Sequence, residues 1–322
     1  MPKSRKLEDT LAALHRLRDD PTAEAAIAQL RQTLAGKNSH AIAKAAKITG
    51  EFEIAALTPD LAAAFERLMV NPAKSDPNCS AKTAVADALY RIGQADETVF
   101  LRGIRHRQME PVYGGRVDTA TELRAVCALG LVRMNYPDAL LELADLLADP
   151  EPRVRAAAAQ AIAYHGSDHG VPLLRLKVLS GDDDASVVSE CLAALLRLAP
   201  ASSLPFAARL LDAADPATSE AAALALGGSR LPDAFEVLRE WWARTADGSL
   251  RRTALVAIAM LRRDQPLDFL RSLIAAAEGP TARDAIAALG MYRHDDAIRQ
   301  RVQECVERRT DIDLRAAFAG AF

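Results

Sequence analysis

A repeat of about 32 residues is the feature of this sequence that most restricts its fold. Each copy centres on an alanine-rich stretch, and the clearest copy is Glu151–Gly166, which reads EPRVRAAAAQAIAYHG. A proline near the start and a glycine at the end are typical of helix ends. A unit of this length cannot bury its apolar face alone, so successive units must stack on one another.

The small residue in the middle of each alanine-rich stretch gives the register of the repeat. From Ala128 onward, successive anchors lie 31 to 33 residues apart. A second helix is predicted after each alanine-rich one, often opened by proline or aspartate as at Pro137 and Pro232. In both helices the apolar residues recur at three- and four-residue spacing. The anchors are Ala13, Ala46, Ala88, Ala128, Ala161, Ala194, Ala225, Ala257, Ala288 and Ala319.

Composition supports helices and argues against a general nucleic-acid binder. Half of the residues are hydrophobic but only 5% are aromatic, and alanine and leucine favour close-packed helices. Forty Lys and Arg residues stand against 43 Asp and Glu residues, so the formal net charge is −3. A basic excess is therefore absent, and only a local cationic patch can bind an anionic partner.

The cysteines and the N-terminal stretch carry no sign of a metal site or of a secreted protein. Cys79, Cys127, Cys191 and Cys305 are far apart and form no metal-ligand spacing. Charges interrupt the first twenty residues, and no later stretch is long and apolar enough to span a membrane. We expect a cytoplasmic protein with no cofactor, no metal and no membrane partner.

The pattern resembles the HEAT-repeat family, and specifically the short HEAT-like repeats of the phycobilin lyases. The residues that carry the resemblance are Asp149–Ile162, DPEPRVRAAAAQAI, and Leu123–Gly130, LRAVCALG. The likeness is good over residues 81–322 and looser over residues 1–80. It implies a single array over residues 1–322, with the alanine-rich helices on the convex side. The predicted fold is an all-α solenoid, a right-handed superhelix of about eight to nine stacked antiparallel helix pairs.

Two consecutive steps of the repeat are longer than the others. The step from Ala46 to Ala88 is 42 residues and contains an insertion at 71–80, and the next step is 40 residues with an insertion at 109–118. Both insertions follow a second helix and precede an alanine-rich one. Insertions at the same phase of adjacent units emerge side by side, often on the binding surface. We expect two long loops there, the second with a flexible Gly114–Gly115 backbone.

Basic residues cluster at the second insertion and predict a cationic rim for an acidic partner. The competing interpretation is that these arginines pair with Glu97, Glu110 and Asp118 in long solvated loops. Trp242 is a further predicted binding residue. Adjacent tryptophans on one helix point about 100° apart, so Trp241 and Trp242 cannot both be buried centrally. The predicted binding residues are Lys74, Arg102, Arg105, His106, Arg107, Tyr113, Arg116 and Trp242.

Known enzymes with HEAT-like repeats give three alternatives. The deoxyhypusine hydroxylases use repeated His-Glu pairs, and none of the six histidines here precedes a glutamate. The alkylpurine DNA glycosylases use a basic groove with aromatic residues, which are scarce here. A phycobilin lyase needs a proton donor, for which Tyr113, His106 and Asp118 are the candidates. No phosphate loop, nucleophile elbow or carboxylate dyad is found.

The sequence therefore predicts a non-enzymatic scaffold that binds a protein or peptide on the second-helix face and the insertion rim. A nucleic-acid-binding protein, with or without glycosylase activity, is the alternative from another class, and a lyase-like enzyme is the third. The C-terminal stretch places Phe318 and Phe322 on one helix face, which adds self-association through this helix as an expectation.

Overall fold

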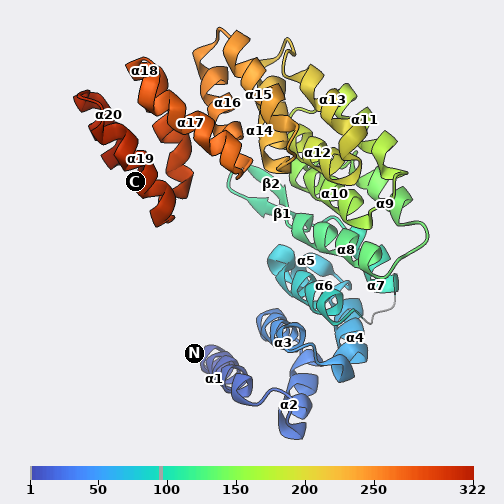
Figure 1. Cartoon of the computed structure of the whole chain (residues 1–322). Helices are drawn as coiled ribbons and strands as arrows, with labels where there is room; N and C mark the ends of the chain where they lie inside the picture. The colour runs from blue at the N-terminus through green and yellow to red at the C-terminus, as the bar shows by residue number, and fades with distance from the viewer. Residues whose placement is uncertain (1, 94–96) are drawn as a thin grey trace. The chain divides into compact units, whose positions relative to one another are not determined.

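The computed structural model describes residues 2–93 and 97–322, with Met1 and residues 94–96 outside the described part. The described residues form twenty α-helices and two β-strands (Figure 1). The prediction of an α-solenoid is thus confirmed, with one short hairpin as the exception to an all-α chain. No helix in the described ranges is both long and apolar enough to cross a membrane.

The helices form two compact units, residues 1–166 and 167–322. The first unit contains α1 (Pro2–Arg16), α2 (Glu24–Leu34), α3 (Ser39–Glu51), α4 (Thr58–Leu68), α5 (Pro72–Ser75), α6 (Ser80–Ile92), α7 (Glu97–Ile104), β1 (Met109–Val112), β2 (Gly115–Asp118), α8 (Thr121–Arg133), α9 (Ala139–Leu146) and α10 (Pro152–His165).

The second unit is entirely helical in its described residues. It contains α11 (Gly170–Ser180), α12 (Ala185–Leu198), α13 (Pro200–Leu210), α14 (Pro216–Ser229), α15 (Ala234–Arg244), α16 (Gly248–Met260), α17 (Asp264–Ala276), α18 (Gly279–Leu289), α19 (Asp296–Glu307) and α20 (Ile312–Ala321).

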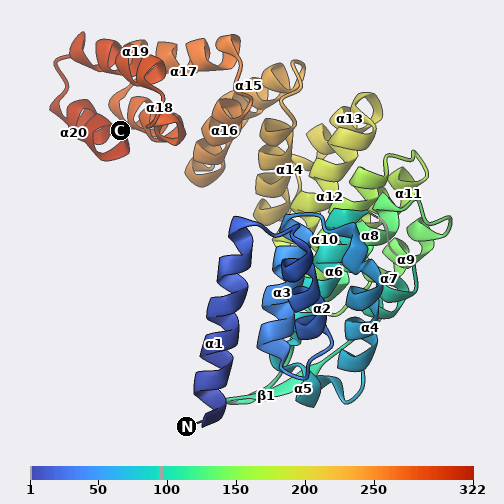
Figure 2. The ribbon, with the colours of Figure 1, turned by 90° about the horizontal axis from the view of Figure 1, so that it is seen from below.

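Within each unit, the alanine-rich helices stack directly on one another. In the first unit the layer runs through α1, α3, α6, α8 and α10, and in the second through α12, α14, α16, α18 and α20 (Figures 1 and 2). The second helices form the other layer, where α2 contacts α4, α4 contacts α7, and α17 contacts α19. In the described chain every alanine-rich helix except the last is followed by a second helix, as the repeat predicts.

Small residues at the anchor positions let neighbouring helices approach closely. All anchors from Ala46 to Ala288 are buried, whereas Ala13 and Ala319, in the first and last helices, are not. The crossing of α3 and α6 is tight enough that a Cβ atom on Gly50 would lie 2.7 Å from the Cα of Ala88. Packing of backbone on backbone therefore explains why this layer is rich in alanine and glycine.

The two insertions are ordered, so the expectation of two long loops is wrong. Residues 71–80 contain α5 and a 3-10 turn at Pro77–Cys79, and residues 109–118 form the β1–β2 hairpin. Asn71 takes a left-handed conformation with φ of 50°, which turns the chain between α4 and α5. Hydrogen bonds between the insertions, described below, supply the order that sequence reasoning missed.

The cysteines are reduced and mostly buried, as expected for structural thiols. Cys79, Cys127 and Cys191 are buried, and Cys305 is half-buried. Burial raises the pKa of Cys79 and of Cys191 to about 12. These thiols therefore stay protonated near neutral pH and are poor nucleophiles.

Candidate functional site

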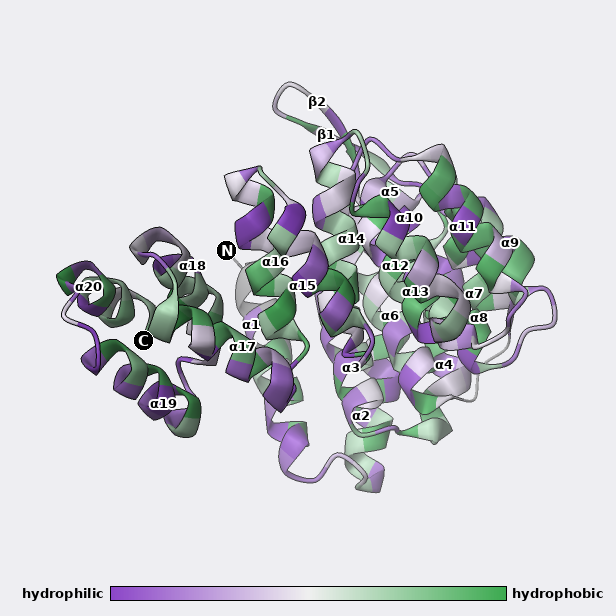
Figure 3. Cartoon of the chain, turned by 45° about the horizontal axis from the view of Figure 1, so that its top comes forward, coloured by the Kyte–Doolittle hydropathy of each residue, from purple (hydrophilic) through white to green (hydrophobic). Residues whose placement is uncertain are grey.

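The hairpin of the second insertion is the main departure from the helical repeat. β1 and β2 are antiparallel, and Val112 is paired with Gly115 next to the turn. Gly114 has φ of +86° and open space where a side chain would lie, so the turn suits a glycine. Figure 3 shows the hairpin extending beyond the helices from which it emerges.

The exposed surface of the hairpin is largely apolar. Tyr113 at the tip is fully exposed, and Val112 beside it is 50% exposed. Met109 and Val117 also have exposed side chains. Apolar side chains gathered on a projecting element are typical of a surface that binds a partner.

Gln108 connects the base of the hairpin to the first insertion. Its side-chain amide donates a hydrogen bond to the backbone oxygen of Asp76, at 2.9 Å. Its backbone N–H donates to the Asp118 carboxylate at 3.0 Å, and its carbonyl accepts from the backbone N–H of Thr119 at 3.0 Å. Because Gln108 is buried, these bonds fix the position of the hairpin with little competition from water.

Glu110 adds a second connection between the insertions. One of its carboxylate oxygens accepts from the backbone N–H of Asn78 at 2.8 Å and from the Thr119 hydroxyl at 2.8 Å. Burial by itself would raise the pKa of Glu110, but hydrogen bonds from Gln108, Thr119 and Asn78 outweigh it and hold the pKa below its usual value. Glu110 is therefore a charged structural group at neutral pH.

A series of buried ion pairs lies beneath the insertions. Asp76 pairs with Lys82 at 3.2 Å, and both side chains are fully buried. Arg124 pairs with Asp118 at 2.7 Å in its own repeat and with Asp149 at 3.1 Å in the next repeat. The carboxylates also cap helices, since Asp76 accepts from the backbone N–H groups of Ala81 and Lys82, at 2.9 Å each.

A cleft of about 500 Å³ lies where the two insertions meet, and we call it the insertion cleft. Its lining includes Lys74 from α5 and Arg107, which immediately precedes Gln108 and the hairpin. The residues that line it, all of them described, include no carboxylate. The prediction that the insertions lie side by side is thus confirmed, and two of the predicted cations share one cleft.

The remaining predicted arginines are engaged in other contacts. Arg102 forms an ion pair with Glu66 on α4, and Arg105 forms one with Glu142 on α9. The expected pairing with Glu97, Glu110 and Asp118 is wrong for these two arginines, because their partners come from the neighbouring repeats instead. Arg107 lies 3.8 Å from Asp149, a loose pair that leaves its side chain 57% exposed. Arg116 donates to the backbone oxygen of Met109 at 2.7 Å and so braces the hairpin.

The three proton-donor candidates of the lyase alternative differ in their surroundings. Burial would raise the pKa of Asp118, but bonds from the Gln108 and Ala120 backbone N–H groups and from Arg124 lower it, so Asp118 holds no proton at neutral pH. Burial lowers the pKa of His106, whose ring is 3.2 Å from the Gln108 side-chain oxygen. Tyr113 is fully exposed at the hairpin tip.

The predicted residue Trp242 lies in the second unit. Trp241 is buried and Trp242 is half-buried, as their helical spacing predicted. Phe269 packs edge-on against Trp242 with ring centroids 5.5 Å apart, and the Arg251 guanidinium lies over its ring at 4.6 Å. A partner-binding role for Trp242 stays a prediction, as does self-association through Phe318 and Phe322, whose rings stack at 5.1 Å.

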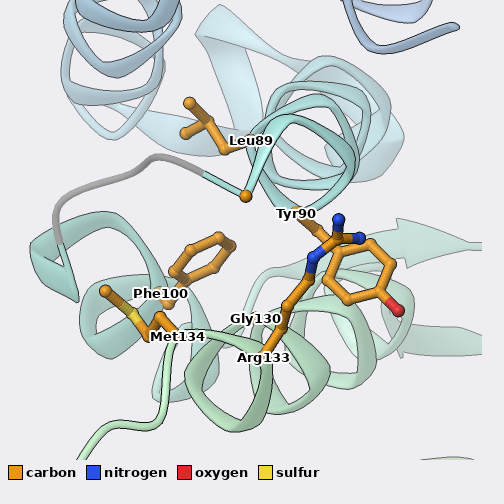
Figure 4. Close-up of a pocket in the computed structure, with 7 residues that line it drawn as sticks. Leu89, Tyr90, Phe100, Gly130, Arg133 and Met134 are labelled. Carbon is orange, nitrogen blue, oxygen red and sulfur yellow. The ribbon is translucent and has the colours of Figure 1, made fainter. Parts of the chain in front are cut away.

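One small pocket has too little volume to bind a ligand. It has a volume of about 10 Å³ and is lined by Tyr90, Phe100 and Arg133 among others (Figure 4), which is room for about one water molecule. The Arg133 guanidinium lies over the Tyr90 ring at 5.1 Å. Among the described residues, no group of three or more His, Cys, Asp and Glu side chains is placed to hold a metal ion.

Sequence reasoning missed the buried residues that organise the site, namely Asp76, Lys82, Gln108 and Arg124. A signal for three of them was present, because an acid precedes a base by six residues in consecutive repeats. The pairs are Asp76 and Lys82, Asp118 and Arg124, and Asp149 and Arg155. Gln108 has no such signal, since a single glutamine in an insertion carries no pattern.

Comparison with known proteins places these repeats in a family. Residues 116–176 and 172–259 match the model for HEAT repeats. No curated protein matches the chain in sequence.

Several solved structures are similar in helical arrangement. The CpcE and CpcF complex of phycocyanin lyase from Nostoc sp. PCC7120 is 18% identical, with 87% of this chain and 93% of that chain covered at a TM-score of 0.35. Human deoxyhypusine hydroxylase in complex with glycerol is 16% identical, with 99% and 96% covered at a TM-score of 0.29. An engineered protein is 15% identical, with 96% and 90% covered at 0.35.

At these TM-scores the solved structures carry no argument about function. The match of the repeats themselves and the stacked helix pairs carry the assignment. Residues 116–259 are HEAT repeats.

Proposed function

We propose that this protein is a non-enzymatic binding scaffold that holds an acidic segment of a protein partner at the insertion platform. The insertion platform is the hairpin Met109–Asp118 together with the insertion cleft. The observation that carries the proposal is the connection between the two insertions through Gln108, which puts an apolar hairpin beside a cation-lined cleft.

Order before binding is the physical advantage of this arrangement. An interface made from flexible loops loses conformational entropy on association, at about 0.5–1.5 kcal/mol for each side chain that becomes fixed. The hairpin is already held by buried hydrogen bonds of Gln108, and the backbone oxygen of Pro72 in α5 accepts a hydrogen bond from the buried Lys82 side chain. Tyr113 and Val112 therefore present apolar area to a partner with less ordering left to do.

The charges of the platform favour an acidic protein over a nucleic acid. Lys74 and Arg107 line a cleft without carboxylates, which attracts acidic side chains. A nucleic acid needs a longer track of free cations, whereas Arg102 and Arg105 are paired with Glu66 and Glu142. The partner's acidic segment would lie in the cleft while its apolar residues cover the hairpin.

Site-directed photo-crosslinking tests the proposal. A photoreactive phenylalanine analogue replaces Tyr113 in one variant and Tyr164 in another, because both tyrosines lie in the first unit and both are exposed. In lysate of the source cells treated with nuclease, position 113 should give discrete protein adducts and position 164 should not. Adding Lys74→Glu and Arg107→Glu to the position-113 variant should reduce the adducts.

The identity of the adduct decides between the proposal and its alternative. Mass spectrometry of the adducts should find protein with an acidic segment. Adducts that vanish on nuclease treatment, or equal labelling from positions 113 and 164, would overturn the proposed function.

A further inference from the structure

A second cleft adjoins the insertion cleft on the other side of α5, and we call it the α5 groove. Its volume is about 380 Å³. Asn71 and Lys74 line both clefts, so α5 is the wall between them. Neither the repeat pattern nor the charge clusters of the sequence pointed to this groove.

The α5 groove has an apolar floor. Ile42 from α3 and Leu68 at the end of α4 are buried beneath it, and Val70, which follows α4, is 65% exposed at its edge. An apolar side chain placed here would be covered from several directions, and such coverage stabilises binding by roughly 25 cal/mol for each Å² of apolar surface removed from water.

Three cations surround this floor. The side chains of Lys37 and Lys74 make no hydrogen bond or ion pair among the described residues, and Arg67 donates one hydrogen bond to the backbone oxygen of Leu34. No carboxylate is among the described residues that line the groove. The groove therefore attracts negative charge at its edge while its floor favours an apolar group.

This combination selects a peptide over other anionic ligands. A nucleic acid would need aromatic side chains on which bases stack, and no aromatic residue lines the groove. A small inorganic anion would leave the exposed Val70 side chain at the edge of the groove uncovered. An acidic peptide with one large apolar residue satisfies both the cations and the floor.

We infer that the α5 groove binds the apolar side chain of an acidic peptide segment, with the flanking carboxylates bound by Lys37, Arg67 and Lys74. The inference rests on the proposed function in one respect, since it names the chemistry of the segment that the scaffold holds. Because Lys74 borders both clefts, an extended segment can cross α5 from the insertion cleft into the groove.

Fluorescence anisotropy with synthetic peptides tests the groove directly. The probe is a fluorescein-labelled peptide with the sequence Gly-Glu-Asp-Leu-Glu-Asp-Gly, and matched peptides carry alanine at the centre or lysine in place of every acid. The full chain should bind the leucine peptide about tenfold more tightly than the alanine peptide, because less apolar surface is buried by alanine. The lysine peptide should not bind.

Variants then locate the binding. Lys37→Glu and Val70→Asp should each weaken binding of the leucine peptide about fivefold or more, because each adds a negative charge to the groove. Lys47→Glu is the matched control, since Lys47 is exposed on α3 but does not line the groove. It makes the same charge change as Lys37→Glu and should change affinity less than about twofold.

The outcomes separate the groove from the hairpin. Three results would each contradict peptide binding in the α5 groove. They are equal binding of the leucine and alanine peptides, equal effects of Lys37→Glu and Lys47→Glu, and no saturable binding up to about 1 mM peptide. If peptide binding to the groove is contradicted but the photoreactive analogue at position 113 still crosslinks in the Val70→Asp variant, the proposed scaffold function is retained. Peptide binding without any Tyr113 adduct supports the groove while the scaffold function fails.

Discussion

Gln108 donates its side-chain amide to the backbone oxygen of Asp76, 2.9 Å away, and so joins two insertions that are 32 residues apart in sequence. Asp76 in turn caps α6 and pairs with the buried Lys82. Gln108 therefore ties the hairpin to the helical core, in addition to the hydrogen bond between Glu110 and Asn78.

Replacing Gln108 with alanine should loosen the hairpin without unfolding the repeats. The change leaves the Asp76 carbonyl without this donor and costs about 2 kcal/mol of unfolding free energy, as is usual for a buried hydrogen bond lost on one side. Amide hydrogen exchange across residues 109–119 should accelerate in the variant, and urea denaturation should report the lower stability.

Gln303→Ala is the control for that measurement. Gln303 makes a 2.7 Å hydrogen bond to Glu307 along an exposed face of α19, where water can replace the lost partner. Its removal should leave both stability and exchange at 109–119 unchanged. Equal effects of the two substitutions would contradict the role given to Gln108.

The stability of the platform should depend on pH through Glu110. Its pKa in the folded protein is lowered, so its contribution to stability is fully present above the unfolded pKa. That contribution is lost as the pH falls through the folded pKa, in acid below about pH 4. Unfolding free energies measured between about pH 6 and pH 3 should fall less steeply for Glu110→Gln than for the native chain. Identical slopes would show that Glu110 keeps no lowered pKa.

Adjacent glycines in α14 offer a sharp test of how closely the alanine-rich helices pack. A Cβ on Gly227 would lie 2.3 Å from the backbone oxygen of Ala257, whereas a Cβ on Gly228 would meet only the end of Met260, at 3.7 Å. Gly227→Ala should therefore lower the melting temperature, at an overpacking cost of about 1–3 kcal/mol. Gly228→Ala should leave it unchanged or raise it, because alanine favours helix. Thermal unfolding followed by circular dichroism measures both, and a reversed order would exclude this packing.

The repeat, the helix order and the common phase of the two insertions were all predictable from the sequence. The regular spacing of the anchors from Ala128 to Ala319 encodes the repeat, because each unit contacts mainly its neighbours and local pattern then determines the fold. The two longer steps between Ala46 and Ala128 mark the insertions. The half-buried Trp242 beside the buried Trp241 was likewise predictable from helical geometry. The acid-to-base spacing of Asp118 and Arg124 was also present in the sequence, although its meaning was not apparent.

Only the tertiary structure decided which charges are free and which are paired. Arg102 and Arg105 resemble Arg107 in sequence, yet they pair with Glu66 and Glu142, each more than 30 residues away. Arg107 instead forms only a loose pair with Asp149 and lines a cleft with Lys74. Stacking brings residues one repeat apart into contact, and the position of a side chain on the stack, rather than its neighbours in the chain, determines its electrostatic partner. For the same reason the α5 groove, built from three separate segments, has no counterpart in the sequence pattern.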